Sequence, residues 1–106
     1  MVKYKGKDTK NHTFWDSICL EMFHPWGYTE IADLLDRCSK SEIASICEGD
    51  VYTWAEENAR GSRFTIEAKE GFVVTKAYAR EHIGYVENQS RKAGYRLAAV
   101  LNRICK

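Results

Sequence analysis

His12 and Asp16 are the residues of this chain whose types and spacing best suit chemistry. If the stretch around them is helical, they stand just over one turn apart, and both side chains leave the same face. A neutral imidazole and a carboxylate placed in this way bind the same divalent cation, and zinc suits the pair best. Trp15 would shield one flank of such a site from water. The alternative is a helix N-terminal cap with an exposed polar pair, because this spacing arises by chance on many helices.

The size and charge of the chain describe one ordinary domain, or part of one. It has 106 residues, with 16 basic and 15 acidic side chains and a net charge of +1. A charge this close to zero excludes a strong field that would recruit nucleic acid or an anionic membrane by itself. Three Trp and six Tyr residues indicate a packed chain and not a disordered one. No apolar run reaches the length of a membrane span, so no membrane segment is expected.

The cysteines lack the paired Cys-x-x-Cys spacing of a structural zinc site. Cys38 and Cys47 flank a short segment that a disulfide would close into a loop, but the connectivity stays open. Sequons that begin at Asn11 and Asn88 favour, with the cysteines, a secretory origin. No signal peptide is expected in the chain itself, because its first residues are polar and basic. The cysteines are Cys19, Cys38, Cys47 and Cys105.

The N-terminal part predicts a strand-like lead-in over residues 1–8 and a helix over about residues 11–22. Cys19 lies on roughly the same face of this helix as His12. It is either a third metal ligand or, as is commoner for a free cysteine, a small buried residue. His24 is expected in the loop that ends the helix. The apolar positions of the helix recur at spacings of three and four, and they are Trp15, Ile18, Cys19 and Met22.

The middle of the chain predicts short helices separated by polar turns. Thr29 is expected to cap a helix that extends to about Cys38. A capping-box pattern that begins at Ser39 starts the next helix, and Asp50 caps the one after it. Residues 60–72 are expected to form a loop with a short alternating segment. The residues that would face inward in the helix after Asp50 are Val51, Trp54 and Ala55.

The last element is a helix expected from Thr75 to about Ile104. Thirty residues in a helix span roughly 45 Å, which is more than the shorter helices can cover. A long, partly apolar helix with too few partners suggests missing chain. The expected architecture is therefore all-α, with residues 1–106 forming a single domain or the C-terminal portion of a larger helical protein.

Motifs in order along the chain resemble those of the trinuclear-zinc, single-strand-specific nucleases. The segment at residues 12–17 resembles the His-x-x-Trp-Asp core of the family motif, and residues 2–7 resemble the strand and turn that precede it. Residues 54–57 resemble a Trp-Ala-x-Glu helix motif. Residues 94–102 resemble the signature Gly-x-Arg-Leu-Ala-x-x-Leu-Asn of the terminal helix. The family includes secreted fungal enzymes, plant bifunctional nucleases and trypanosomatid 3′-nucleotidase/nucleases, and its fold resembles that of the zinc-dependent phospholipases C.

The resemblance implies that His12 and Asp16 are ligands of one of three zinc ions. No other residue matches a family ligand, so the remaining ligands would lie in a missing N-terminal part of the same protein, and this chain alone would be inactive. The implied activity is hydrolysis of phosphoester bonds in single-stranded RNA or DNA and in 3′-nucleotides. The implied localisation is secreted or at the cell surface. The preference among these substrates, the natural start and the oligomeric state stay open.

Two other functions remain compatible with the residues. One is a non-catalytic helical interaction module, in which His12 and Asp16 are surface residues and the long terminal helix docks a partner protein. The other is a zinc-dependent phospholipase, which the shared fold permits but the terminal helix signature favours less.

Overall fold

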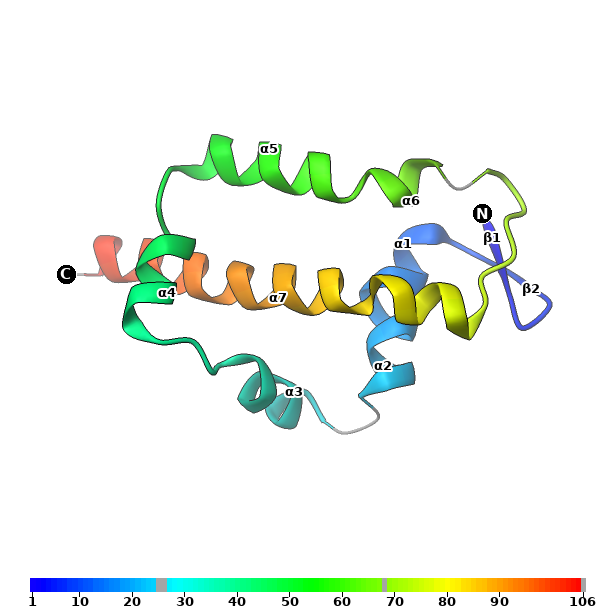
Figure 1. The fold of residues 1–106 in the computed structure, drawn as a ribbon, viewed down its shortest axis with the longest axis horizontal. Helices are drawn as coiled ribbons and strands as arrows, with labels where there is room; N and C mark the ends of the chain where they lie inside the picture. The colour runs from blue at the N-terminus through cyan, green and yellow to red at the C-terminus, as the bar shows by residue number, and fades with distance from the viewer. Residues whose placement is uncertain (25–26, 68, 106) are drawn as a thin grey trace.

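The structure, a computed structural model, describes residues 1–24, 27–67 and 69–105. It is helical apart from one small hairpin, which confirms the all-α prediction (Figure 1). Among these residues, no helix combines the length and apolar character needed to cross a membrane. The elements are β1 Val2–Tyr4, β2 Lys7–Thr9, α1 Asn11–Thr13, the π-helix η1 Phe14–Ile18, α2 Cys19–Phe23, α3 Tyr28–Leu35, α4 Lys40–Ile46, α5 Val51–Gly61, α6 Arg63–Glu67 and α7 Lys76–Ile104.

The lead-in is an antiparallel hairpin of β1 and β2. Lys5 and Gly6, at its turn, both have positive φ angles, as the tight primed turns of hairpins require. Val2 is buried in the core, and the backbone of Lys3 bonds to Phe72 and Val74 just before α7. The hairpin thus holds the start of the chain against the start of the longest helix.

The first predicted helix is present, but its centre is π-helical. The amide of Cys19 donates to the carbonyl of Phe14, five residues earlier. Residues five apart point in different directions from an α-helix, whereas a wider π turn brings them to one face. Phe14 and Cys19 are both fully buried, so the π turn allows two core residues at this spacing. The predicted apolar stripe did not include Phe14. It included Trp15 and Met22, which are only half-buried in the structure.

The middle of the chain differs from its prediction at two places. Helix α3 begins after an extended Gly27 and ends at Leu35, so Thr29 is not its cap. The expected loop after residue 60 is mostly helical, since α5 extends to Gly61 and α6 follows it. The capping box at Ser39 and the cap at Asp50 are present, as predicted, and Asp50 also forms a capping box with Thr53.

Helix α7 is the axis of the molecule, and Thr75 caps its N-terminus. Its first turns cover the core, where Ala79 is fully buried and Ile83 packs beside it. Helix α5 runs along one side of α7 and α3 lies on the other, with α4 near the C-terminal end (Figure 1). The core is therefore at the N-terminal end of α7, next to the hairpin. The residues that form it are Val2, Phe14, Cys19, Val74 and Ala79.

Polar contacts, more than apolar packing, attach α5 to α7. Glu57 binds Lys92 at 2.9 Å and Arg96 at 2.8 Å, and these two cations lower the pKa of its carboxyl to about 2. Tyr85 donates to the carbonyl of Asn58 at 3.3 Å. The expected inward packing of Val51 and Ala55 is wrong, because both are exposed and only Trp54 is half-buried. The α5 helix has an apolar side with little of the chain to cover it.

Candidate metal centre

His12 lies in α1, at the start of the helical segment that continues through η1 and α2. Its side chain is exposed, and no hydrogen bond or ion pair within the described residues ties it down. Helix α1 follows directly after the hairpin, and the amide of Phe14 donates to the carbonyl of Lys10 at 3.1 Å. The imidazole is therefore exposed to solvent, while the hairpin before His12 and the hydrogen bond from Phe14 to Lys10 hold the backbone around it.

Asp16 lies in η1, one turn after His12. Its side chain lies outside the part of the chain that the structure describes, so its use as a ligand stays a prediction. The backbone around it is the π-helical turn, whose bonds join residues five apart. Turns of this kind are rare and are often found at functional sites. The segment predicted to do chemistry therefore coincides with the unusual backbone of the molecule.

Trp15 stands between the two predicted ligands and is held by a defined set of contacts. Its indole N–H donates to the Asn11 side-chain oxygen at 3.1 Å, and the Asn11 amide donates to the Thr65 carbonyl at 2.7 Å. Its ring meets the edge of Phe64 with the centroids 5.1 Å apart. These contacts join α1 to α6 and hold Trp15 in place, while the shielding of a metal ion by Trp15 stays a prediction.

No third ligand joins His12 within the described residues. No group of three or more His, Cys, Asp or Glu side chains suited to a metal ion occurs among them. Cys19 is fully buried, and burial together with the nearby Glu87 carboxylate raises the pKa of its thiol to about 11. A neutral thiol is a poor ligand, so Cys19 is a core residue. Tetrahedral zinc takes at least three protein ligands, and the described part of the chain does not assemble that number.

His24 is the main residue whose contacts the sequence did not predict. It lies just after α2, in the loop position expected for it, but it is buried and pairs through Nε2 with Glu87 of α7. A histidine before Pro25 gives no sign of this, since Glu87 is 63 residues away in the chain. The pair fixes α2 on α7 and so supports the helical segment that carries His12.

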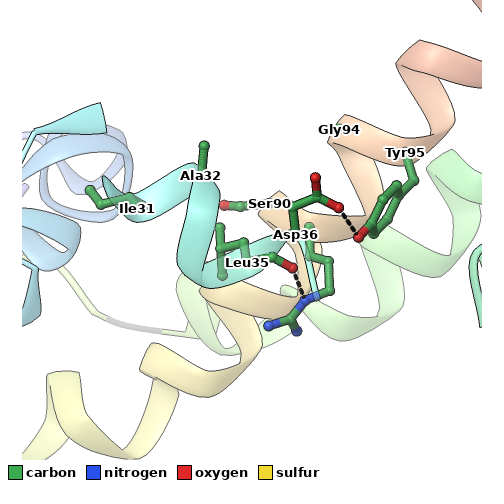
Figure 2. A pocket seen from close by; sticks show the side chains of 8 residues that line it. Ile31, Ala32, Leu35, Asp36, Ser90, Gly94 and Tyr95 are labelled. Carbon is green, nitrogen blue, oxygen red and sulfur yellow. Dashed lines mark hydrogen bonds between the residues drawn. The ribbon is translucent and has the colours of Figure 1, made fainter. Parts of the chain in front are cut away.

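Figure 2 shows a hollow between α3 and α7, on the other side of α7 from α5. Its volume is about 390 Å³. Two hydrogen bonds join the end of α3 to α7 beside it: Tyr95 donates to Asp36 at 2.5 Å, and Arg91 donates to the Leu35 carbonyl at 2.7 Å (Figure 2). None of the metal candidates lies there.

The model of the family described as S1/P1 Nuclease matches residues 1–106. The chain belongs to the S1/P1 nuclease family. No curated protein and no solved structure matches it.

Membership of the S1/P1 nuclease family agrees with the helical architecture and with the resemblance found in the motifs. The family is one of nucleases, so its general chemistry is hydrolysis of phosphodiester bonds in nucleic acids. The assignment of His12 and Asp16 as metal ligands within this chemistry stays a prediction.

Proposed function

We propose that this chain is part of a zinc-dependent enzyme that cleaves single-stranded RNA or DNA and 3′-nucleotides. His12 and Asp16 would be protein ligands of one zinc ion, and the other ligands would come from a preceding part of the same protein. The observation that carries the proposal is the arrangement of two residues in an S1/P1 nuclease. His12 is exposed, and it lies one turn before Asp16, which is part of the π-helical turn. The proposal includes secretion or a cell-surface location, as the resemblance implies.

The residues present fit such an ion in part. A neutral imidazole and a carboxylate are suitable zinc ligands, and His12 is accessible. When bound, the metal ions would activate water, orient the phosphate and stabilise the leaving 3′-oxygen. The role of the chain is to place the two ligands and to exclude water from one flank through Trp15. The bonds from Trp15 to Asn11 and from Asn11 to Thr65 hold that flank in place.

Preference for single strands has a physical basis. Bases in a duplex are stacked and paired, whereas bases in a single strand enter a cleft and stack on side chains. The net charge of +1 gives little general attraction to a polyanion. Binding would therefore depend on the metal cluster and on base contacts, which suits a local, single-stranded substrate.

The test is a measurement of bound zinc and of phosphoester hydrolysis for two preparations. One is this chain alone, and the other is the chain extended by the polypeptide encoded upstream of it. We expect about three zinc ions for each extended chain and almost none in the shorter one, with hydrolysis of single-stranded DNA by the extended chain only.

The variant His12→Ala in the extended chain should lose zinc and most of the activity. Ser17→Ala is the matched control, because Ser17 is exposed on the same helical segment and has no proposed role. Unchanged zinc content and turnover in the His12 variant would remove His12 from the site. Absence of zinc from both preparations would favour the helical interaction module instead.

A further inference from the structure

Two segments of the chain carry the motif Asn-x-Ser/Thr, and neither of their asparagines is a predicted metal ligand. The motif is the acceptor for N-linked glycans when its middle residue is not proline. A glycan is bulky and hydrophilic, so a folded protein accommodates one only where the asparagine faces solvent. The fold gives the two asparagines different surroundings. The two segments are residues 11–13 in α1 and residues 88–90 in α7.

Asn88 lies on the side of α7 that faces away from the core. About two and a half helical turns separate it from the fully buried Ala79, so the two side chains leave opposite sides of the helix. The exposed apolar residue Leu97 is about two and a half turns further on, and it therefore lies on the same side as Ala79. Asn88 itself is exposed, and its side chain forms no hydrogen bond within the described residues. A group attached to Asn88 would point into solvent.

The residues on either side of Asn88 fix this orientation. Glu87 pairs with His24, just after α2, and Gln89 donates to the Asn58 side chain of α5 at 3.4 Å. Successive residues of a helix are turned by about 100°, so Asn88 points between these two contacts and away from both neighbouring segments. Rotation of α7 that buried Asn88 would break both contacts.

The surface around Asn88 is open on its own side of the helix. Gly84 lies one turn before Asn88, and a Cβ added at Gly84 would meet no neighbouring atom. Lys92 lies one turn after it and extends to Glu57 of α5, with 2.9 Å between the charged groups. The side chains next to Asn88 are thus absent or directed elsewhere, which leaves room for a sugar.

Asn11 carries the same motif in closed surroundings. It is half-buried, and its side-chain nitrogen donates to the Thr65 carbonyl at 2.7 Å. Its side-chain oxygen accepts from the Trp15 indole at 3.1 Å. A glycan on Asn11 would therefore stand at the contact between α1 and α6, whereas one on Asn88 would leave every described contact of the fold in place.

The segment around Asn88 is also suited to modification before α7 has packed. Acceptor motifs commonly lie in loops, and helices in proteins gain most of their stability from tertiary packing. Gly84 and Gly94 lie on either side of the motif, and each weakens a helix by about 1 kcal/mol relative to alanine. Residues 88–90 are therefore open in the unpacked chain, and the glycan projects into solvent once the helix has formed.

We propose that Asn88 is the N-glycan acceptor of this chain, in preference to Asn11. The inference rests on the proposed function in one respect, which is passage through a secretory pathway. In the reaction, the side-chain nitrogen of Asn88 forms a bond to the anomeric carbon of an oligosaccharide carried on a lipid pyrophosphate. The bond from that carbon to the pyrophosphate oxygen breaks, the lipid pyrophosphate leaves with the electron pair, and the nitrogen loses one proton.

The test uses the chain with the polypeptide encoded upstream of it, produced as one protein in a eukaryotic culture. A glycosidase that releases N-glycans converts each modified asparagine to aspartate, so mass spectrometry of the peptides gives the occupancy of each site. Asn88→Gln and Ser90→Ala each remove the motif in α7. Thr13→Ala is the matched control, because it removes the other motif and leaves the Asn11 side chain in place. All three positions are exposed, so the variants should retain the circular dichroism of the wild type.

We expect a glycosylated form that migrates more slowly on a denaturing gel. It should be lost in Asn88→Gln and in Ser90→Ala and retained in Thr13→Ala. Occupancy of Asn11 equal to or above that of Asn88 would overturn the proposal, as would the absence of a glycan from both sites. The zinc content of the same material separates this inference from the metal site. A glycan on Asn88 in a protein without zinc would support the acceptor and overturn the zinc proposal, and a zinc-loaded protein without a glycan would do the reverse.

Discussion

Truncation of Phe14 tests the explanation that the π turn containing Asp16 allows Phe14 to be a core residue. Phe14 is fully buried and packs on Tyr4 and Trp15, with ring centroids 5.4 Å and 4.9 Å away. Removing a buried phenylalanine ring costs about 3–5 kcal/mol. A chain of this length has a total stability of roughly 5–15 kcal/mol. Phe14→Ala should therefore remove a large share of the free energy of unfolding.

The assay is urea unfolding followed by circular dichroism, with Phe14→Leu and Tyr52→Ala as comparisons. Phe14→Leu retains most of the buried volume and should cost less than about 1.5 kcal/mol. Tyr52 is 84% exposed, so its truncation should change stability by no more than about 0.5 kcal/mol. If Phe14→Ala costs no more than Tyr52→Ala, Phe14 is not a core residue and the explanation of the π turn is wrong.

Two further predictions concern the attachment of α5 to α7. The lowered pKa of Glu57, about 2 instead of 4.5, means that its ion pairs stabilise the fold above pH 4.5 and lose this effect as the pH falls toward 2. Because the Glu57 side chain is 40% exposed, the ion pairs should contribute only about 0.5–1 kcal/mol to the stability. The melting temperatures of Glu57→Gln and the wild type should differ at pH 7 and converge near pH 2. A Cβ added at Gly61 would lie 2.5 Å from the Tyr85 ring, so Gly61→Ala should destabilise by about 1–3 kcal/mol. A Cβ added at Gly84 meets no neighbouring atom, so Gly84→Ala should instead stabilise α7 by about 0.8–1 kcal/mol. The two variants should therefore shift the melting temperature in opposite directions. Shifts of the same sign would contradict the close contact between residue 61 and the Tyr85 ring.

The long helix and the helix caps could be predicted because their signals are local. Ser39 precedes Glu42 at the spacing that a capping box needs, Asp50 is a residue type that commonly caps helices, and the structure has both caps. The period of apolar residues after Thr75 likewise predicted α7, which ends at Ile104 as expected. These features depend on neighbours within one or two turns, which a single sequence contains.

Features that depend on distant contacts could not be predicted. The π turn depends on the burial of Phe14 and Cys19 by segments that include Val74 and Ala79. His24 is buried because Glu87 meets it from α7. No spacing in the sequence encodes either contact, so the sequence predicted neither the burial of Phe14 nor the pairing of His24 with Glu87.

The candidate site divides in the same way. The spacing of His12 and Asp16 is local, and family membership gives it a chemical context. The bonds that fix Trp15 beside them come from Asn11 and, through it, from Thr65, which is 54 residues away from Asn11. A Phe64 to Tyr85 edge contact and a Phe64 to His82 stack extend this support to α7. Only the folded chain shows that one flank of the predicted site is built from three separate parts of the sequence.

The bond from the Asn11 amide to the Thr65 carbonyl has a consequence for modification of the protein in a secretory pathway. The same side-chain nitrogen that donates this bond is the atom to which an N-linked glycan would attach. A glycan would replace one of the two N–H bonds of that nitrogen and would place a sugar beside the Thr65 carbonyl, where it would crowd the docking of α6. A chain that folds before it meets the glycosylation machinery keeps its Asn11 amide engaged with α6, whereas the sequon at Asn88 stays exposed on α7. The order of folding and modification would then affect how closely α6 packs beside Trp15.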